Sequence, residues 1–378
     1  MHEMHPDEEG EMMDLNVIYL TDPDASGRLD RVLDDALKDA EKKVSVHWIE
    51  SADDFCDAAE HGELEQVNLL FAVDLDESGI NMEMMEVLRY LHRNRDCLTG
   101  SVGGVIIDGV DDYYTKDAGR RLAFAANMAG CTLPGKPLVE GTGSLRNFDI
   151  LAKNLKTTNR GAYGETARQL VEKILSFRIE ENHHPKVLVV HASSRKTSNS
   201  LLLWSKVAQH LEGHGEIEEI SLRDGEVWDC RGCKYEACVH FGEKSSCFYG
   251  GVMVEKIYPA IIKGDILVLI CPNYNDAIGA NIMAFINRLT AVFRTNDFSR
   301  KRVYAIVVSG YSGGDIVAQQ IMGAINMNKN FILPAKFALM ATANNPGSVL
   351  EIEDIDQQAA EFAEQILLKD QILRGERI

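Results

Sequence analysis

Short, continuous apolar segments are the feature that most restricts the folds open to this chain. Residues 66–73 (QVNLLFAV) and 265–271 (DILVLIC) are apolar almost throughout, which is typical of strands buried on both faces of a parallel sheet. Each is followed by a segment with helical spacing of apolar residues, at 82–92 and 278–293. Strands that alternate with helices in this way predict an α/β fold in which helices cover both faces of a parallel sheet.

The alternation runs through the chain twice, with a polar stretch at 178–185 (RIEENHHP) between the two series. We therefore expect two tandem domains, at residues 1–180 and 186–378, each a doubly wound sheet of five parallel strands. The predicted strands are residues 14–20, 44–48, 66–73, 102–107 and a weak edge strand at 133–139, then 186–191, 217–222, 265–271, 303–309 and 337–343. The predicted helices are residues 28–42, 82–92, 118–129 and 164–177, then 201–211, 253–262, 278–293, 315–327 and 355–373.

The charge of the chain excludes one class of partner. The formal net charge is −19, and residues 1–182 hold −17 of it, with 19 basic and 36 acidic side chains. Binding a nucleic acid backbone requires a basic surface, so nucleic acid is not an expected partner. No apolar run has the length of a membrane span, and residues 1–11 are acidic without an apolar signal core. We therefore expect a cytoplasmic protein with no membrane contact.

A phosphate-binding loop is predicted directly after the first strand of the second half. Residues 191–201 (HASSRKTSNSL) contain hydroxyls, amides and cations and no acidic side chain, and they lead into a helix. The free N–H groups at the start of a helix and the helix dipole favour an anion there. A helix cap alone would need one serine. The candidate phosphate ligands are Ser193, Arg195, Ser198, Asn199 and Ser200.

Two further loops follow the next buried strands, and the carboxyl ends of parallel strands are where ligands of such sheets bind. In residues 272–277 (PNYNDA), Tyr274 could lie beside a flat ring while the asparagines contact its polar edges. In residues 309–315 (SGYSGGD), the glycines allow a ligand close to the backbone, and Tyr311 could stack on a ring. The candidate ring ligands are Pro272, Asn273, Tyr274, Asn275, Ser309, Gly310, Tyr311, Gly313 and Gly314.

Together these motifs resemble the NADPH-dependent FMN reductase and iron–sulfur flavoprotein branch of the flavodoxin-like superfamily. Residues 192–200 (ASSRKTSNS) are similar to that family's phosphate loop, roughly G-S-P-R-K-x-G-N-T, without its two glycines. Residues 272–274 match its P-x-Y, and residues 285–288 (FINR) match its F-I-D-R, with Asn287 in place of the acidic residue. The resemblance implies two tandem flavodoxin-like domains, of which the second binds FMN through the residues named above.

The resemblance also implies an activity. The expected protein is an FMN-dependent oxidoreductase that passes electrons from NAD(P)H, a transient donor, to a quinone, a flavin or an iron–sulfur acceptor. No GxGxxG fingerprint is present for a resident dinucleotide. Relatives form oligomers, and a dimer is favoured here. Two alternatives stay open: a flavin-binding electron carrier or redox sensor without substrate turnover, and a non-catalytic scaffold that holds zinc.

Four cysteines are clustered within residues 228–250, which we regard as an insertion in the second domain. Cys230, Cys233, Cys238 and Cys247 are spaced C-x2-C-x4-C-x8-C. The resemblance implies a [4Fe–4S] cluster at this place, although the family's spacing is more compact. Four thiolates also suit structural zinc. A cluster, zinc and plain thiols all remain open on the sequence alone.

The first half resembles the same fold without its chemistry. Its strand-end loops at 21–27 (TDPDASG), 74–78 (DLDES) and 108–114 (DGVDDYY) are acidic, and carboxylates repel a phosphate. We therefore predict a degenerate domain that does not bind FMN. Acidic loops could instead hold Mg²⁺ or Ca²⁺. Solvated loops are the interpretation we prefer.

Overall fold

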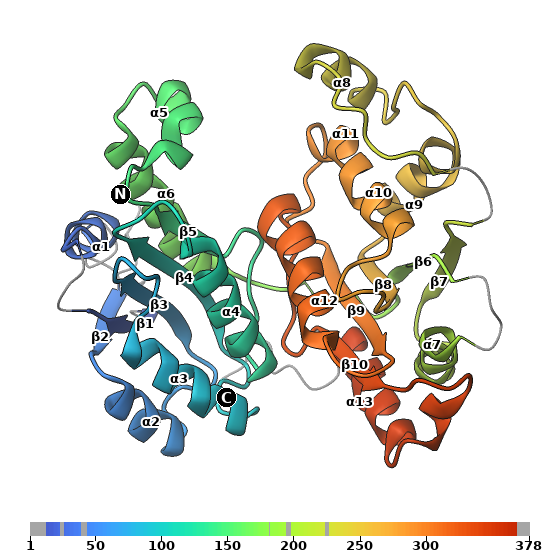
Figure 1. The fold of residues 1–378 in the computed structure, drawn as a ribbon, viewed down its shortest axis with the longest axis horizontal. Coiled ribbons are helices and arrows are strands. Elements are labelled where there is room, and N and C mark those ends of the chain that lie inside the picture. The colour runs from blue at the N-terminus through green and yellow to red at the C-terminus, as the bar shows by residue number, and fades with distance from the viewer. Residues whose placement is uncertain are drawn as a thin grey trace, which may run out of the picture.

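The computed structural model describes residues 13–22, 26–38, 44–180, 182–193, 198–223 and 227–368. Within these residues the chain forms two parallel five-stranded sheets (Figure 1). Their strand orders are β2-β1-β3-β4-β5 and β7-β6-β8-β9-β10, which is one order used twice. Two tandem flavodoxin-like α/β domains, as predicted, are therefore confirmed as the fold.

The first sheet consists of β1 (Met13–Leu20), β2 (Val44–Ile49), β3 (Asn68–Leu75), β4 (Val102–Gly109) and β5 (Leu138–Gly141). Every residue of β3 and β4 is buried, as expected for central strands. One face packs against α2 (Ala52–Glu60), α3 (Met82–Arg93) and α4 (Thr115–Met128). The other face packs against α1 (Leu29–Leu37), α5 (Asp149–Leu155) and α6 (Asn159–Ser176).

The second sheet consists of β6 (Lys186–His191), β7 (Glu216–Ser221), β8 (Ile266–Pro272), β9 (Arg302–Ser309) and β10 (Ala338–Thr342). On one face lie α9 (Tyr258–Lys263), α10 (Ala280–Arg288), α11 (Thr290–Phe293) and α12 (Gly314–Ile321), with π-helical turns at Met253–Ile257 and Met322–Met327. On the other face lie α7 (Asn199–Leu211) and α13 (Ile355–Leu367). The short helix α8 (Tyr235–Gly242) packs on α11 outside the sheet.

The two domains meet along a seam of reciprocal contacts. Leu133 and Leu333 form an antiparallel bridge, each N–H donating to the other carbonyl at 2.9 Å. Lys136 N donates to Asn326 O at 3.0 Å, and Lys336 N donates to Asn127 O at 2.9 Å. One apolar core continues across the seam from α4 to the α12 side of the second sheet, and Figure 1 shows α4 and α12 side by side. The contacts therefore relate the domains by an approximate two-fold axis.

Strand positions agree with the sequence predictions to within a few residues, whereas one strand and three helices differ. The segment 133–139 forms its strand only at Leu138–Gly141, and its first residues form the seam instead. Helices α2, α5 and α8 were not predicted. No helix among the described residues is long and apolar enough to span a membrane.

Candidate functional site

The loop after β6 leads into the N-terminus of α7. Ser198 is the residue before this helix, and among the described residues its side chain makes no capping hydrogen bond. Ser193 is half-buried and Ser200 is buried. Arg195 lies outside the described residues. The first N–H groups of α7 are therefore free of a side-chain cap from Ser198, which is the arrangement that anion binding at a helix N-terminus uses.

Asn199, the first residue of α7, connects this loop to a loop that the sequence analysis did not single out. Its side-chain amide donates to the carbonyls of Ala343 (3.0 Å) and Asn345 (2.9 Å), and its Oδ1 accepts from the N–H of Gly347 (2.9 Å). The carboxamide thus ties the phosphate-loop end to residues 343–349, which follow β10. The polar, proline- and glycine-containing sequence of that segment (ANNPGSV), directly after a predicted strand, is the signal that could have identified it as a further loop of the site.

Asn273 holds the second and third predicted loops together. Its Nδ2 donates to Ser312 O (2.8 Å), to Asp276 Oδ1 (3.1 Å) and to Ser309 Oγ (3.3 Å). Its Oδ1 is buried and has no hydrogen-bond partner among the described residues. A buried acceptor without a donor costs free energy unless a ligand satisfies it. A polar ring edge with an N–H donor fits that requirement.

The backbone of these loops allows an unusually close approach. Asn275 and Asp276 both have positive φ, 56° and 53°. Gly313 has φ +79°, and a Cβ placed on it would lie 2.1 Å from Asp276 Oδ1 and 3.0 Å from Asn273 Nδ2. Only glycine fits at position 313, because a side chain there would separate the two loops. Gly314 begins α12.

Two aromatic side chains project from the joined loops into solvent. The exposed fractions of Tyr274 and Tyr311 are 64% and 81%. Tyr311 is restrained by Asn344, whose Nδ2 donates to its hydroxyl at 3.2 Å. Pro272 and Gly310 flank them at the ends of β8 and β9. The structure therefore brings the ring candidates to one sheet edge, with unburied aromatic faces beside a buried acceptor.

Arg28 occupies the corresponding edge of the first domain. Its guanidinium forms a two-point ion pair with the fully buried carboxylate of Asp108, with both N···O distances 2.9 Å. It also donates to four backbone carbonyls at 3.0 to 3.2 Å, those of Gly109, Gly141, Thr142 and Gly143. Ser26 Oγ donates to Asp108 Oδ1 at 2.9 Å. The chain itself thus fills the carboxyl edge of this sheet.

The acidic loops of the first domain are not simply solvated, which corrects our interpretation. Asp74 and Asp108 lie side by side in register on β3 and β4 and are buried. Burial raises the pKa of Asp74 to about 6, with Asp108 adding to the effect and the N–H of Asp22 opposing it. Among the described residues, no three His, Cys, Asp or Glu side chains converge into a metal site.

The four clustered cysteines also lie among the described residues, and they do not converge into a metal site. Cys230 and Cys233 are exposed, whereas Cys238 and Cys247 are half-buried. Burial raises the pKa of the Cys238 thiol, Arg294 opposes the shift, and the other three thiols add to it. The predicted cluster or zinc site is therefore not supported by the arrangement of these side chains.

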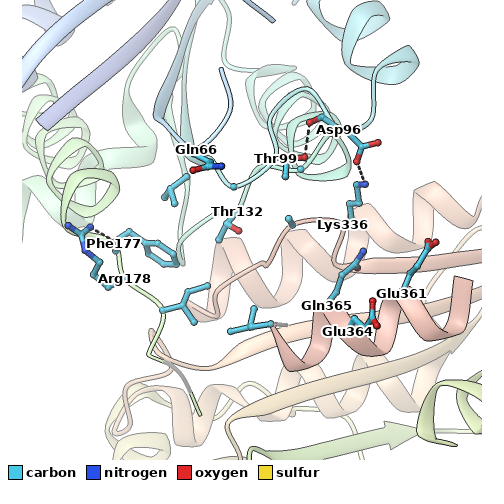
Figure 2. A pocket seen from close by; sticks show the side chains of 16 residues that line it. Gln66, Asp96, Thr99, Thr132, Phe177, Arg178, Lys336, Glu361, Glu364 and Gln365 are labelled. Carbon is cyan, nitrogen blue, oxygen red and sulfur yellow. Dashed lines mark hydrogen bonds and ion pairs between the residues drawn. The ribbon is translucent and has the colours of Figure 1, made fainter. Parts of the chain in front are cut away.

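A large cavity lies at the opposite edge of the sheets (Figure 2). It has a volume of about 530 Å³ and is lined by Gln66, Thr132 and the linker residue Arg178, and by Lys336 and Gln365 of the second domain. Lys336 forms an ion pair with Asp96 across it. Gln66 and Thr132 precede β3 and β5. Ligands of open parallel sheets bind at the other ends of the strands, so this cavity is not the candidate site.

Comparison with known proteins agrees with the geometry. Residues 185–345 match the family model described as NADPH-dependent FMN reductase. No curated protein matches the chain. Similar solved structures include the Trp repressor binding protein from Bacillus subtilis, which is 20% identical with a TM-score of 0.33 and covers 47% of this chain and 96% of its own. The NAD(P)H:quinone oxidoreductase from Methanothermobacter marburgensis is 14% identical with a TM-score of 0.38 and covers 48% and 99%.

An FMN-dependent NADH-azoreductase from Bacillus anthracis, solved in complex with FMN, is 12% identical with a TM-score of 0.34 and covers 48% and 99%. The family match spans all five strands of the second sheet, β6 to β10. It includes all three predicted loops, at 191–201, 272–277 and 309–315. Over residues 185–345 the C-terminal domain is therefore similar to the NADPH-dependent FMN reductases, and this match covers less than half of the chain.

Proposed function

We propose that the chain binds one FMN at the carboxyl edge of its second sheet and passes electrons from NAD(P)H through it to a quinone, a flavin or an iron–sulfur partner. The observation that carries this proposal is the joining of the 272–276 and 309–314 loops by Asn273, with exposed Tyr274 and Tyr311 beside its unsatisfied Oδ1. When bound, the flavin supplies the hydride chemistry.

The chain's own residues would bind and orient that flavin. The N-terminus of α7, with Ser193, Arg195, Ser198 and Ser200, would hold the phosphate. Asn199 would position this loop against residues 343–349, since its carboxamide already bonds to that backbone. Asn273 would accept from the ring edge, and Gly313 would keep the two ring loops in contact.

We further propose that only the second domain binds flavin. In the first domain, the equivalent edge carries the Arg28–Asp108 ion pair, and Arg28 caps the carbonyls where a ligand would approach. Removing that pair to admit an anion would leave a buried carboxylate without its cation. A cytoplasmic location and a homodimer remain predictions, the latter to be measured by size-exclusion chromatography with light scattering.

Flavin titration of the purified chain and of two glycine variants tests the proposal. Gly313→Ala is expected to weaken FMN binding at least about ten-fold, because its Cβ would displace Asp276 and Asn273. Gly213→Ala is the matched control, since Gly213 has φ +80° and nothing within 4 Å of its Cβ position. Equal losses in both variants, or no FMN uptake by the parent chain, would overturn the proposed site.

Turnover separates the reductase from the alternatives. An FMN-loaded chain should be bleached by NAD(P)H without oxygen and reoxidised by an uncharged quinone such as menadione. FMN binding without bleaching would contradict the reductase and favour an electron carrier or redox sensor. Zinc without flavin would favour the scaffold, although no described thiol set converges on a metal position.

A further inference from the structure

A second cleft at the seam opens beside the glycine-rich loop of the proposed flavin site. It has a volume of about 600 Å³ and lies between α3 and α4 of the first domain and α12 and β10 of the second. Asp315 in its wall directly follows Gly314. Met340, also in its wall, has its Cβ 3.9 Å from where a Cβ on Gly314 would lie. Two residues of the cleft wall therefore lie next to the end of the glycine-rich loop.

The first-domain wall of this cleft is strongly basic. Four arginines and a histidine line it, namely Arg89, His92, Arg93, Arg95 and Arg121. They are opposed by one lining carboxylate, Asp315. This is a local reversal of charge, because residues 1–182 as a whole carry −17. Four of the 19 basic side chains of that half line this cleft, although Arg89 and Arg93 also line a smaller cavity with Asp53, Glu60 and Glu86.

Ordinary structural roles do not account for this concentration. Arg89 forms an ion pair with Glu86, but within the described residues Arg93, Arg95 and Arg121 form no ion pair and are exposed. The dipole of α3 favours cations at its C-terminus, which explains His92 and Arg93. It does not explain Arg95, which lies beyond the helix, or Arg121, which lies in the middle of α4.

Most of the other residues that line the cleft are apolar. Leu88, Phe124 and Met128 come from the first domain and Met340 from the second. Such a surface fits a ligand with anionic groups at one end and a flat, weakly polar ring at the other. The chain has no GxGxxG turn to hold a pyrophosphate, so a dinucleotide donor needs another anchor for its phosphates.

We infer that the first domain provides this anchor: Arg93, Arg95 and Arg121 bind the phosphate groups of the nicotinamide dinucleotide whose ring reaches the flavin from the cleft. The inference rests on the proposed function and assigns donor recognition to the domain that lacks a flavin site. Arginine suits the task because its planar fork bonds phosphate oxygens at two points.

Steady-state kinetics of Arg93→Ala and Arg121→Ala with two donors test the inference. NADPH carries the phosphates, and N-benzyl-1,4-dihydronicotinamide has the same reactive ring without them. Each variant should raise the KM for NADPH about ten-fold or more, as expected for a charge-assisted hydrogen bond, with kcat and the rate with the benzyl donor unchanged within about two-fold. Arg121→Lys should recover part of the lost affinity for NADPH. A comparison with NADH, which lacks the 2′-phosphate, should show whether an arginine contacts that phosphate or the pyrophosphate.

Arg160→Ala is the matched control, because Arg160 is exposed on α6, on the other face of the first sheet. Calorimetric titration with 2′,5′-ADP gives a readout independent of turnover, and Arg121→Ala should weaken this binding while FMN affinity stays unchanged. An NADPH KM that is unchanged in both variants, or raised equally in Arg160→Ala, would overturn the inference. Failure of both donors to bleach the flavin would instead overturn the proposed function.

Discussion

The two seam asparagines allow a quantitative prediction about how the domains are held together. Asn127 is fully buried, and its Nδ2 donates to Pro334 O across the seam (2.7 Å) and to Cys131 O in its own domain (3.0 Å). Asn326 is also fully buried, and its Nδ2 donates to Pro134 O (3.0 Å) and to Phe331 O (2.8 Å). Each carboxamide therefore donates to carbonyls in both domains.

Replacing either asparagine with alanine leaves two buried carbonyls without a donor. A buried unsatisfied polar group costs about 1–3 kcal/mol, so Asn127→Ala should lower the free energy of unfolding by about 2–4 kcal/mol. Asn326→Ala should cost less, because alanine also removes the Asn326 Oδ1, a buried acceptor without a partner among the described residues. The double variant should lose less than the sum, because both changes open the same seam.

Urea unfolding followed by circular dichroism measures these losses from the transition midpoints. Asn94→Ala is the control: its Nδ2 also donates to a backbone carbonyl, that of Tyr90 at 3.1 Å, but the residue is exposed, so water replaces the bond and the loss should stay below about 1 kcal/mol. If the seam variants lost no more than Asn94→Ala, or if the two losses simply added, the reciprocal lock would be refuted. A new, separate transition would show that the domains unfold independently once the lock is removed.

Two predictions concern the closed edge of the first domain. The folded-state pKa of Asp74, about 6, lies above its ordinary value of 3.8, so the contribution of this carboxyl to the free energy of unfolding is complete below about pH 4 and is lost as the pH rises through 6. Asp74→Asn should make the free energy of unfolding depend less on pH and should raise it at pH 7 by up to about 3 kcal/mol. A variant whose pH profile ran parallel to that of the parent chain would contradict this prediction. Arg28→Ala should cost about 3–5 kcal/mol by leaving Asp108 buried without its cation, measurable as a fall in Tm; an unchanged Tm would contradict our account of the first domain.

Most of the fold could be predicted because the signal is local. The central strands β3 and β8 are continuous apolar runs, and their positions agree with the sequence to within two residues. Helix α2 (ADDFCDAAE) was missed because it is short and largely acidic, with Phe55 as its one large buried side chain. The seam was missed for a different reason: Leu133 and Leu333 are 200 residues apart, and nothing in the surrounding sequence marks them as partners.

The candidate site also has parts that the sequence predicts and parts that it does not. The 272–277 and 309–315 loops could be predicted to meet because the ends of adjacent strands share one edge of a sheet. The role of Asn273 as their connector, and the second-domain loop at 343–349 bound by Asn199, depend on side-chain directions that sequence does not report. Likewise, nothing in the sequence indicates that Arg28 pairs with Asp108, 80 residues away, and so we predicted solvated aspartates in the first domain.

The reciprocal seam suggests why the first domain, for which we propose no flavin site, stays fused to the second. Because the two sheets are related by an approximate two-fold axis, the helices of each domain lie against the other, and α4 meets α12 close to the glycine-rich loop. A free second copy would bring its own phosphate loop and its own flavin. In the fused copy, Arg28 fills that edge, and three arginines without an ion pair among the described residues, Arg93, Arg95 and Arg121, line the cleft. Duplication followed by this exchange of roles would convert a symmetric pair of flavin sites into one flavin site with a dedicated wall for its donor.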